Sequence, residues 1–195
     1  MRLLIIAPEL YPVPSRKGTS VETCIYHIAS QLAKRHRVTV ICRRDRSLPH
    51  ATVRGKLNIV RVRGGSKAKY IAQVIRWAKG KSFDYIQVDN RPNFLGKIKK
   101  CFPNTPISIF LHSLTYVTPP QASIRVVRKQ LVHAAVIVTN SHSLKQQLMK
   151  RFPKQEKKMK VVHLGVDLSQ FRPPSVRERR NIRTKYNAKG AFTVV

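Results

Sequence analysis

The chain has 195 residues, 42% of them hydrophobic, which is the composition of a globular protein with a sizeable core rather than of a disordered one. No apolar run approaches the roughly 18 residues that a membrane-spanning helix needs. The run Leu3–Ala7 is too short for the core of a signal peptide, so we expect no export and a cytoplasmic protein. The charge is unusual, because 39 basic residues against 8 acidic ones give a formal net charge of +31. Such an excess predicts attraction to an anionic lipid surface, a nucleic acid or a phosphorylated small molecule. The alternative is that the proteins of the source are basic in general and that the charge has no specific partner.

The basic residues are unevenly distributed. They are sparse in residues 101–150, which contain no acidic residue, so we expect this segment to supply much of the core and of the inner cleft. Around residues 67–81 and 97–100 and in the C-terminal tail they predict a positive face. The three cysteines, Cys24, Cys42 and Cys101, cannot all pair with one another and show no metal-binding spacing, so we expect reduced, mostly buried thiols.

Short apolar, β-branched runs alternate along the chain with longer amphipathic stretches, which predicts strands joined by helices. The runs that we expect to form seven strands are, in chain order, Leu3–Ala7, Val38–Cys42, Ile59–Val62, Tyr85–Val88, Ile107–Leu111, Val136–Thr139 and Val161–Leu164. Between them, apolar residues at helical spacing form three stripes: Val21, Cys24, Ile25, Ile28 and Leu32; Ile71, Val74, Ile75 and Ala78; and Leu144, Leu148 and Phe152, with Ser141 or Ser143 as the N-cap of the last helix. This alternation predicts right-handed crossovers and an α/β fold with a Rossmann-like, doubly wound, mostly parallel seven-stranded sheet.

The pattern breaks near the C-terminus. Residues 171–174 carry two prolines, and residues 176–190 are basic and polar, as in a linker or a loosely held helix. Residues 191–195 have the composition of a strand that is just beginning. We therefore expect one domain over residues 1–175, followed in 176–195 by a linker and the truncated start of a further domain.

The ligand site of an open α/β sheet lies outside the carboxyl ends of its strands, so the residues that follow each strand are the candidates. After the first strand, Gly18 and Thr19 precede a helix that begins near Ser20, where free N–H groups and the helix dipole favour a phosphate, and Arg16 and Lys17 add positive charge. Because the chain has no Gly-x-Gly-x-x-Gly or Walker motif, an ordinary turn glycine explains the local sequence equally well.

Polar residues also follow later strands. They are Asp89, Asn90 and Arg91 after the fourth strand, His112 after the fifth, and Asn140 and Ser141 after the sixth. A lone histidine is more often a satisfied core or cap residue than a catalyst, but its place at the end of a central strand favours a role for His112 in the site. For Asn140 and Ser141, simple capping of the next helix is the alternative.

Five segments occur in an order and with a spacing that are specific when taken together: PELYPVPSRKGTSVE, FDYIQVDNRPNF, FLHSLTYV, AAVIVTNSHSLKQQL and VVHLGVDLSQFRP. Over residues 1–175 the chain resembles the N-terminal domains of family 4 glycosyltransferases, in the branch of the spore-coat-associated glycosyltransferase-like proteins. The resemblance implies the GT-B architecture, of which this chain would be the acceptor-side half. In that family the principal contacts to the donor, a basic pair and two glutamates, belong to the other half, so we expect the 195-residue chain alone to be inactive.

The resemblance also implies roles for single residues. Gly18 matches the first glycine of a pair that contacts the donor diphosphate, and Thr19 replaces the second, where a side chain would crowd the phosphate. His112 matches the histidine beside the transferred sugar and is the expected catalytic residue. The expected acceptor-binding residues are Glu22, Asn90, Arg91, Asn140 and Ser141. The family requires no metal or other cofactor, and the chain has no Asp-x-Asp motif or His/Cys cluster that would hold one.

Two functions of different classes follow. The first is the acceptor-side half of a retaining glycosyltransferase, which moves a sugar from a nucleotide-sugar donor to a glycan, a lipid-linked acceptor or a surface polymer, in the cytoplasm, at the inner face of the membrane or at a spore surface. The second is a stand-alone basic module that binds anionic membrane or another polyanion without catalysis. Nucleic acid is the weaker partner, because few aromatic residues lie among the basic ones and no nucleic-acid motif occurs.

Overall fold

A computed structural model describes residues 1–15, 19–169, 171–188 and 190–191 of the chain. The chain divides into two compact units, Met1–His163 and Leu164–Val195. The first unit contains one eight-stranded sheet with the strand order β3-β4-β2-β1-β5-β6-β7-β8. Its strands are β1 (Arg2–Ile6), β2 (Arg37–Arg43), β3 (Ala51–Arg54), β4 (Leu57–Val62), β5 (Tyr85–Asp89), β6 (Ile107–Leu111), β7 (Val136–Thr139) and β8 (Met159–Val161). All neighbouring strands are parallel except β3 and β4, so the predicted α/β fold with a mostly parallel sheet is confirmed.

The predicted strand count of seven is wrong, because β3 is an additional edge strand. Its four residues are mostly exposed and include a polar threonine and an arginine, so they lack the apolar run that marks the buried strands. β3 returns to β4 through a tight turn in which Gly55 has a φ of 55° and Arg54 pairs with Leu57. A glycine at the first position of a two-residue hairpin loop was the available signal.

The last strand was also placed too late, at Val161–Leu164. β8 instead pairs with the short strand β7 from Met159 opposite Ile137 to Val161 opposite Thr139. The N–H of Val162 still donates to the carbonyl oxygen of Thr139 at 2.9 Å, and beyond it β7 offers no further partner. β8 therefore ends where its partner strand ends, although the apolar residues continue beyond it in the sequence.

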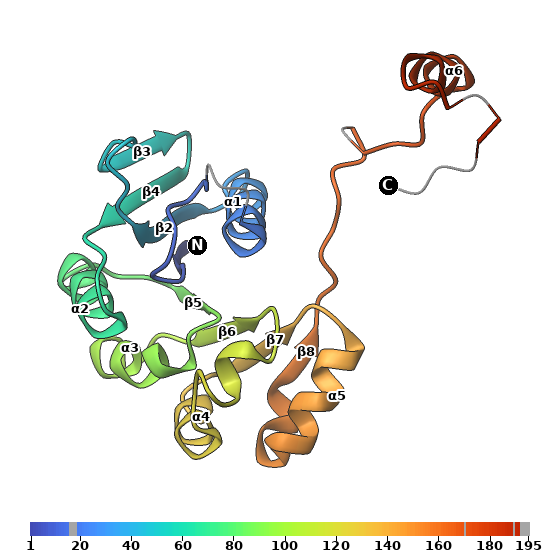
Figure 1. The fold of residues 1–195 in the computed structure, drawn as a ribbon. Helices are drawn as coiled ribbons and strands as arrows, with labels where there is room; N and C mark the ends of the chain where they lie inside the picture. The colour runs from blue at the N-terminus through green and yellow to red at the C-terminus, as the bar shows by residue number, and fades with distance from the viewer. Residues whose placement is uncertain (16–18, 170, 189, 192–195) are drawn as a thin grey trace. The chain divides into compact units, whose positions relative to one another are not determined.

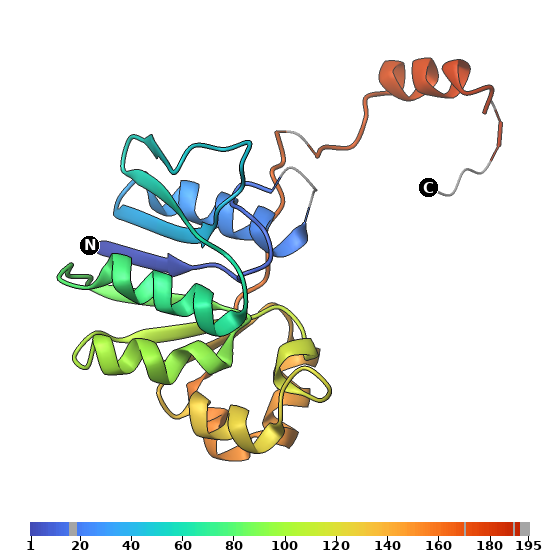
Figure 2. The ribbon, with the colours of Figure 1, turned by 60° about the vertical axis from the view of Figure 1, so that its left-hand side comes forward.

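The helices cover both faces of the sheet. They are α1 (Ser20–Leu32), α2 (Lys67–Ala78), α3 (Leu95–Cys101), α4 (Ile124–Leu131) and α5 (His142–Arg151), with short 3-10 helices η1 (Pro92–Phe94), η2 (Thr115–Val117) and η3 (Pro153–Lys158). Figures 1 and 2 show α1 on one side of the sheet and α2 and α3, side by side, on the other. The buried apolar residues form two clusters: a smaller one under α1, and a larger one that includes residues of α2, α3, α4 and α5. The predicted stripes of α2 and α5 lie on the buried faces of these helices, whereas in α1 only Ile25 of the stripe is fully buried, and Glu22 and Ala29 complete the buried face.

The strand order creates a crevice between β1 and β5. From β1 the chain proceeds outward to β2 and β4, and α2 then carries it back to β5 on the other side of β1. The loops that follow β1 and β5 therefore leave the sheet in opposite directions, which is the switch point where open α/β sheets bind ligands. β6 is buried at every position and apolar except at Ser108, as expected for a central strand of a parallel sheet that is covered on both faces.

The second unit contains α6 (Val176–Lys185), which has no buried residue. It begins with a capping box, in which the hydroxyl of Ser175 accepts from the N–H of Glu178 and the Glu178 carboxylate accepts from the N–H of Ser175. Arg172 makes an ion pair with the same carboxylate. The domain boundary predicted at residue 175 lies inside this unit, and the assignment of 176–195 to a further domain stays a prediction.

Two findings bear on the expectations from composition. None of the helices in the described parts of the chain is long and apolar enough to cross a membrane. The cysteines are free, but only Cys42 is buried, Cys24 is partly exposed and Cys101 is exposed. The expectation of mostly buried thiols is therefore wrong for Cys101, which is the last residue of α3 and points away from the cluster that the same helix buries through Leu95 and Ile98.

Candidate functional site

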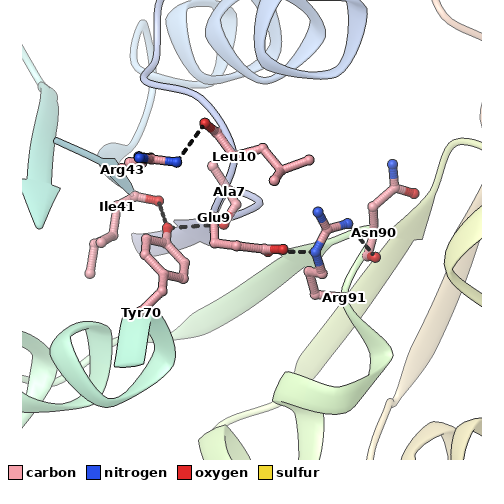
Figure 3. Close-up of polar contacts among 8 residues, drawn as sticks. All are labelled: Ala7, Glu9, Leu10, Ile41, Arg43, Tyr70, Asn90 and Arg91. Carbon is pink, nitrogen blue, oxygen red and sulfur yellow. Dashed lines mark hydrogen bonds and ion pairs between the residues drawn. The ribbon is translucent and has the colours of Figure 1, made fainter. Parts of the chain in front are cut away.

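The loop that follows β1 is held by side chains from other elements, as Figure 3 shows. The hydroxyl of Tyr70, in α2, lies 3.0 Å from the carbonyl oxygen of Ala7 and 3.1 Å from that of Ile41, and donates to one of them at a time. Burial raises the pKa of Tyr70 well above its ordinary value, so the hydroxyl remains a donor. At the end of β2, Nη1 of Arg43 lies 3.4 Å from the carbonyl oxygen of Leu10. These contacts fix the direction in which the loop leaves the sheet.

The same loop is tied a second time at Val13. Its N–H donates to Sγ of Cys42 at 3.2 Å, and its carbonyl oxygen accepts from Nη2 of Arg61 at 2.8 Å. Arg61 is buried and also donates to the carbonyl oxygen of Pro49, so it joins the loop to the segment before β3. Burial raises the pKa of Cys42 to about 11, and the thiol stays uncharged.

A buried ion pair connects the loop after β1 to the end of β5. Nε of Arg91 lies 2.5 Å from Oε2 of Glu9, and only 3% and 5% of the two side chains is exposed. Nη1 of Arg91 donates to the carbonyl oxygen of Asn90 (Figure 3). The guanidinium also lies over the ring of Tyr116, 3.7 Å from its centroid. Nη2 is buried and has no hydrogen-bond partner among the described residues. Arg91 thus joins the loop after β1 to the end of β5, and the two N–H groups of its Nη2 have no partner in the described part of the chain.

Asn90 turns the chain at the end of β5. Its φ is 52°, in the left-handed region that asparagine tolerates better than most residues. Its N–H continues the sheet by donating to the carbonyl oxygen of Phe110, while its Oδ1 accepts from the N–H of His112 at 2.9 Å. This single residue therefore sets the positions of both Arg91 and His112.

His112 is oriented by an acid that is buried beside it. Its Nε2 lies 3.1 Å from Oδ1 of Asp89, whose other oxygen accepts from Nε2 of Gln87, and its ring stacks on Phe110 with 4.2 Å between centroids. A carboxylate only accepts hydrogen bonds, so neutral His112 carries its proton on Nε2 and leaves Nδ1 as an acceptor. The side chain is 8% exposed, so the ring is held in one orientation at the end of β6.

Asn140 extends this network to the end of β7. Its Nδ2 donates to the carbonyl oxygen of His112 at 3.1 Å. The hydroxyl of Ser141 accepts from the N–H of Leu144 at 3.2 Å and caps α5. The capping alternative for Ser141 is therefore observed, and its role with an acceptor stays a prediction.

A cavity of about 170 Å³ opens between the loop after β1, the start of α1 and η2. Polar groups reach it from Thr19, Glu22, Asn90 and Arg91, and apolar surface comes from residues that include Tyr116. Thr19 is the N-cap of α1, but its side chain makes no capping hydrogen bond, and its buried Oγ1 has no partner within the described residues. Glu22 is 4% exposed and lies in the first turn of α1.

The structure brings most of the predicted residues together in two linked groups. Thr19, Glu22, Asn90 and Arg91 line the cavity, whereas His112 and Asn140 do not line it but are joined to it through the side chain of Asn90. Gly18 lies outside the described residues. The roles assigned to all these residues stay predictions.

Sequence reasoning missed Glu9 and Tyr116. Both lie in loops after predicted strands, which is the signal that could have found them, but their pairing with Arg91 appears only in the folded chain. Among the described residues, no group of three or more His, Cys, Asp or Glu side chains is placed to hold a metal ion.

The comparisons with known proteins agree on one family. The model of Glycosyltransferase Family 4 matches residues 21–170. Spore coat protein SA of Bacillus subtilis (strain 168) is 30% identical over 191 residues, which are 97% of this chain and 49% of that protein. YtcC of the same strain, whose name places it among the glycosyltransferases, is 28% identical over 189 residues, 97% of this chain and 46% of that protein. The chain spans about half the length of the curated relatives it matches.

Solved structures confirm the fold. Anabaena HepE in complex with UDP matches with a TM-score of 0.69 and 18% identity, over 96% of this chain and 50% of that one. The lipopolysaccharide outer core galactosyltransferase WaaB matches with a TM-score of 0.56 and 17% identity, over 91% of this chain and 50% of that one. The Rossmann-like fold expected for one half of a GT-B glycosyltransferase is therefore confirmed.

Proposed function

This chain belongs to Glycosyltransferase Family 4, and on that premise we propose that it is the acceptor-side half of a retaining glycosyltransferase. The complete enzyme would move a sugar from a nucleotide-sugar donor to a glycan, a lipid-linked acceptor or a surface polymer. The observation that carries the proposal is the network at the carboxyl ends of β5, β6 and β7, in which Asn90 bonds to Arg91 and His112, and Asn140 joins through the carbonyl oxygen of His112. Complexes of the related fold of HepE with UDP and UDP-glucose support a nucleotide-sugar as the donor.

In this proposal His112 acts on the transferred sugar. Asp89 holds the proton on Nε2, so Nδ1 is free to accept a hydrogen bond from a sugar hydroxyl near the reacting carbon. The first free N–H groups of α1 would face the donor diphosphate, where negative charge develops on the leaving group. Gly18 lies outside the described residues, and its contact with the diphosphate stays a prediction. No step of this scheme calls for a metal or another cofactor.

The test uses the polypeptide that carries residues 1–195 together with a donor-binding half. The His112→Ala variant should lower kcat by about 10²-fold, while the Kd for the nucleotide-sugar should change little, because the proposed contact is made at the reacting sugar. His50→Ala is the matched control, since His50 is exposed and its side chain makes no hydrogen bond among the described residues. An equal loss in both variants, or a change confined to donor affinity, would contradict the role.

Residues 1–195 alone provide a second test. We expect weak or undetectable binding of UDP-sugars, because the principal donor contacts belong to the other half of such enzymes. Titration calorimetry with UDP and UDP-glucose measures this directly. Robust sugar transfer by this chain alone would show that the chemistry is held differently.

A second candidate function is docking to an anionic membrane, which the exposed basic side chains of α2 and α3 favour. Lys67, Lys69 and Arg76 are exposed on α2, and Lys97 and Lys100 on α3, the helix beside it (Figures 1 and 2). Each base near such a surface contributes about 1 kcal/mol at moderate salt. The affinity for phosphatidylglycerol vesicles should therefore fall steeply as the salt concentration rises. An affinity that does not change with salt would contradict this candidate function. A peripheral place at the inner membrane face or at a spore surface belongs to the same proposal.

A further inference from the structure

A second cavity, of about 470 Å³, lies at the amino ends of β2 and β4, at the opposite end of the strands from the network around His112. Its lining comes from β2, from β4 and from the turn that joins β3 to β4, and includes Arg37, Thr39, Lys56 and Asn58. Thr39 pairs with Asn58 in the parallel register, so these two side chains share one face of the sheet. The volume is within the roughly 300–1,000 Å³ of sites for small molecules.

Arg37 and Lys56 give this cavity a positive charge that the chain does not balance. Both side chains are exposed, and neither makes a hydrogen bond or an ion pair with the described residues. All eight acidic residues of the chain lie in its described parts, and none of them lines the cavity. Arg2 is the neighbour of Arg37 in β1, but a 3.1 Å ion pair with Asp84 already neutralises it. The charges therefore favour an anionic ligand.

Thr39 and Asn58 add neutral polar groups to the lining. Oδ1 of Asn58 is buried and has no hydrogen-bond partner among the described residues, which is costly unless water or a ligand supplies one. A half turn of the carboxamide exchanges Oδ1 for Nδ2, so Asn58 can present N–H donors to an anion, and the hydroxyl of Thr39 can donate as well. Two cationic side chains beside two neutral donors match the oxygens of a phosphate group.

The sheet holds the two cationic residues next to each other. The N–H of Val38 donates to the carbonyl oxygen of Lys56 at 2.9 Å, so the backbones at Arg37 and Lys56 cannot separate without breaking the sheet. Arg54, on the other side of the same turn, donates to the hydroxyl of Tyr26 in α1 at 2.8 Å. An isolated surface charge is screened beyond about 8 Å at physiological salt, whereas two adjacent charges act together on one bound anion.

We propose that this cavity binds a phosphate group, held by Arg37 and Lys56 with Asn58 and Thr39 as neutral donors. The phosphate belongs either to a free phosphorylated molecule or to the headgroup of an anionic lipid, because both present the same oxygens. The inference goes beyond the proposed function and does not depend on it, since the cavity and the network around His112 lie at opposite ends of the strands.

The first test is a titration of the 195-residue chain with inorganic phosphate and with glycerol 3-phosphate, followed by nuclear magnetic resonance at about 0.15 M sodium chloride. Both probes should produce saturable shifts of the amides of Thr39, Lys56 and Asn58, and neutral glycerol should not. No saturable shift at these amides with either phosphate probe would overturn the proposal.

Variants separate this site from the general positive charge of the chain. Arg37→Gln/Lys56→Gln should weaken phosphate binding at these amides at least tenfold, because it removes two charge-assisted hydrogen bonds. Arg125→Gln/Lys129→Gln is the matched control, since it removes one arginine and one lysine from exposed positions of α4, which does not line the cavity. An equal loss in the two double variants would mean that phosphate follows only the net charge, and would also overturn the proposal.

Vesicles then identify the source of the phosphate. Sedimentation with phosphatidylglycerol vesicles, at the same salt concentration, compares the two double variants with the native chain, and phosphatidylcholine vesicles are the uncharged reference. A larger loss of binding in Arg37→Gln/Lys56→Gln than in the α4 variant would support a lipid headgroup as the ligand. Equal vesicle binding in the two variants, together with the shifts produced by free phosphate, would support a free phosphorylated molecule.

Discussion

The buried ion pair between Glu9 and Arg91 permits a quantitative prediction. The side chains are 5% and 3% exposed, so Glu9→Gln keeps the shape of the residue but leaves a guanidinium buried without its counter-charge. Breaking a buried pair in this way costs about 3–5 kcal/mol. For a unit of this size, 1 kcal/mol shifts Tm by about 2–4 °C, so the variant should melt roughly 6–20 °C lower.

Urea unfolding measures this loss, with Trp77 as the fluorescent probe, because it is the one tryptophan of the chain and packs against the larger core cluster. The double variant Glu9→Gln/Arg91→Met should be less destabilised than the sum of the two single variants, with a coupling of about 0.5–3 kcal/mol. Asp84→Asn breaks the exposed pair with Arg2 and is the control that should change stability little.

Two results would refute this reasoning. The first is a Glu9→Gln variant that unfolds at the same urea concentration as the native chain. The second is a double variant whose loss equals the sum of the single losses. Either would mean that the charge of Arg91 is compensated by other groups and that Glu9 does not hold the crevice closed.

The remaining predictions concern titration and reactivity. At pH 8, iodoacetamide should alkylate Cys101 rapidly and Cys42 only in denaturant. The reason is that Cys101 is exposed, whereas Cys42 is buried and its pKa is raised to about 11. Mass spectrometry measures both rates, and equal rates in the native protein would contradict this prediction. Hydrogen bonds from Arg172 and from Ser175 lower the pKa of Glu178 from 4.5 to about 2, so its stabilisation of α6 is complete above pH 4.5 and is lost as the pH falls toward 2. The ¹³Cα shifts of α6 should report this loss, Glu178→Gln should abolish the pH dependence, and shifts that are constant over this range would refute it.

Much of the fold could be predicted because its signals are local. Alternating apolar runs predicted seven of the eight strands, the last of them too late in the chain, and the helical stripes predicted the buried faces of α2 and α5 and part of that of α1. The strand that was missed, Ala51–Arg54, lies at the edge of the sheet, where burial imposes no apolar pattern. The error at Val161–Leu164 has a related cause, since the strand ends where its partner ends and not where apolar residues do.

The site was predictable only as a set of positions. The order of strands and helices placed Asn90, His112 and Asn140 after consecutive strands of a parallel sheet, whose carboxyl ends must lie along one edge. The partners of these residues were not predictable in the same way. Asp89 was noted beside Asn90, but its contact with the ring of His112 depends on how β5 and β6 are aligned.

The sequence by itself determined the alternation of elements, the parallel sheet and the edge at which a ligand would bind, because apolar periodicity acts over a few residues and the crossover rule over one strand–helix–strand unit. Only the tertiary structure decided which charges meet. Glu9 and Arg91 are 82 residues apart, and their pairing depends on a loop that Tyr70 and Arg61 hold in place from two other elements. That pairing puts a carboxylate beside Arg91 at the edge of the cavity, so the contacts of the site depend on long-range packing that no local pattern records.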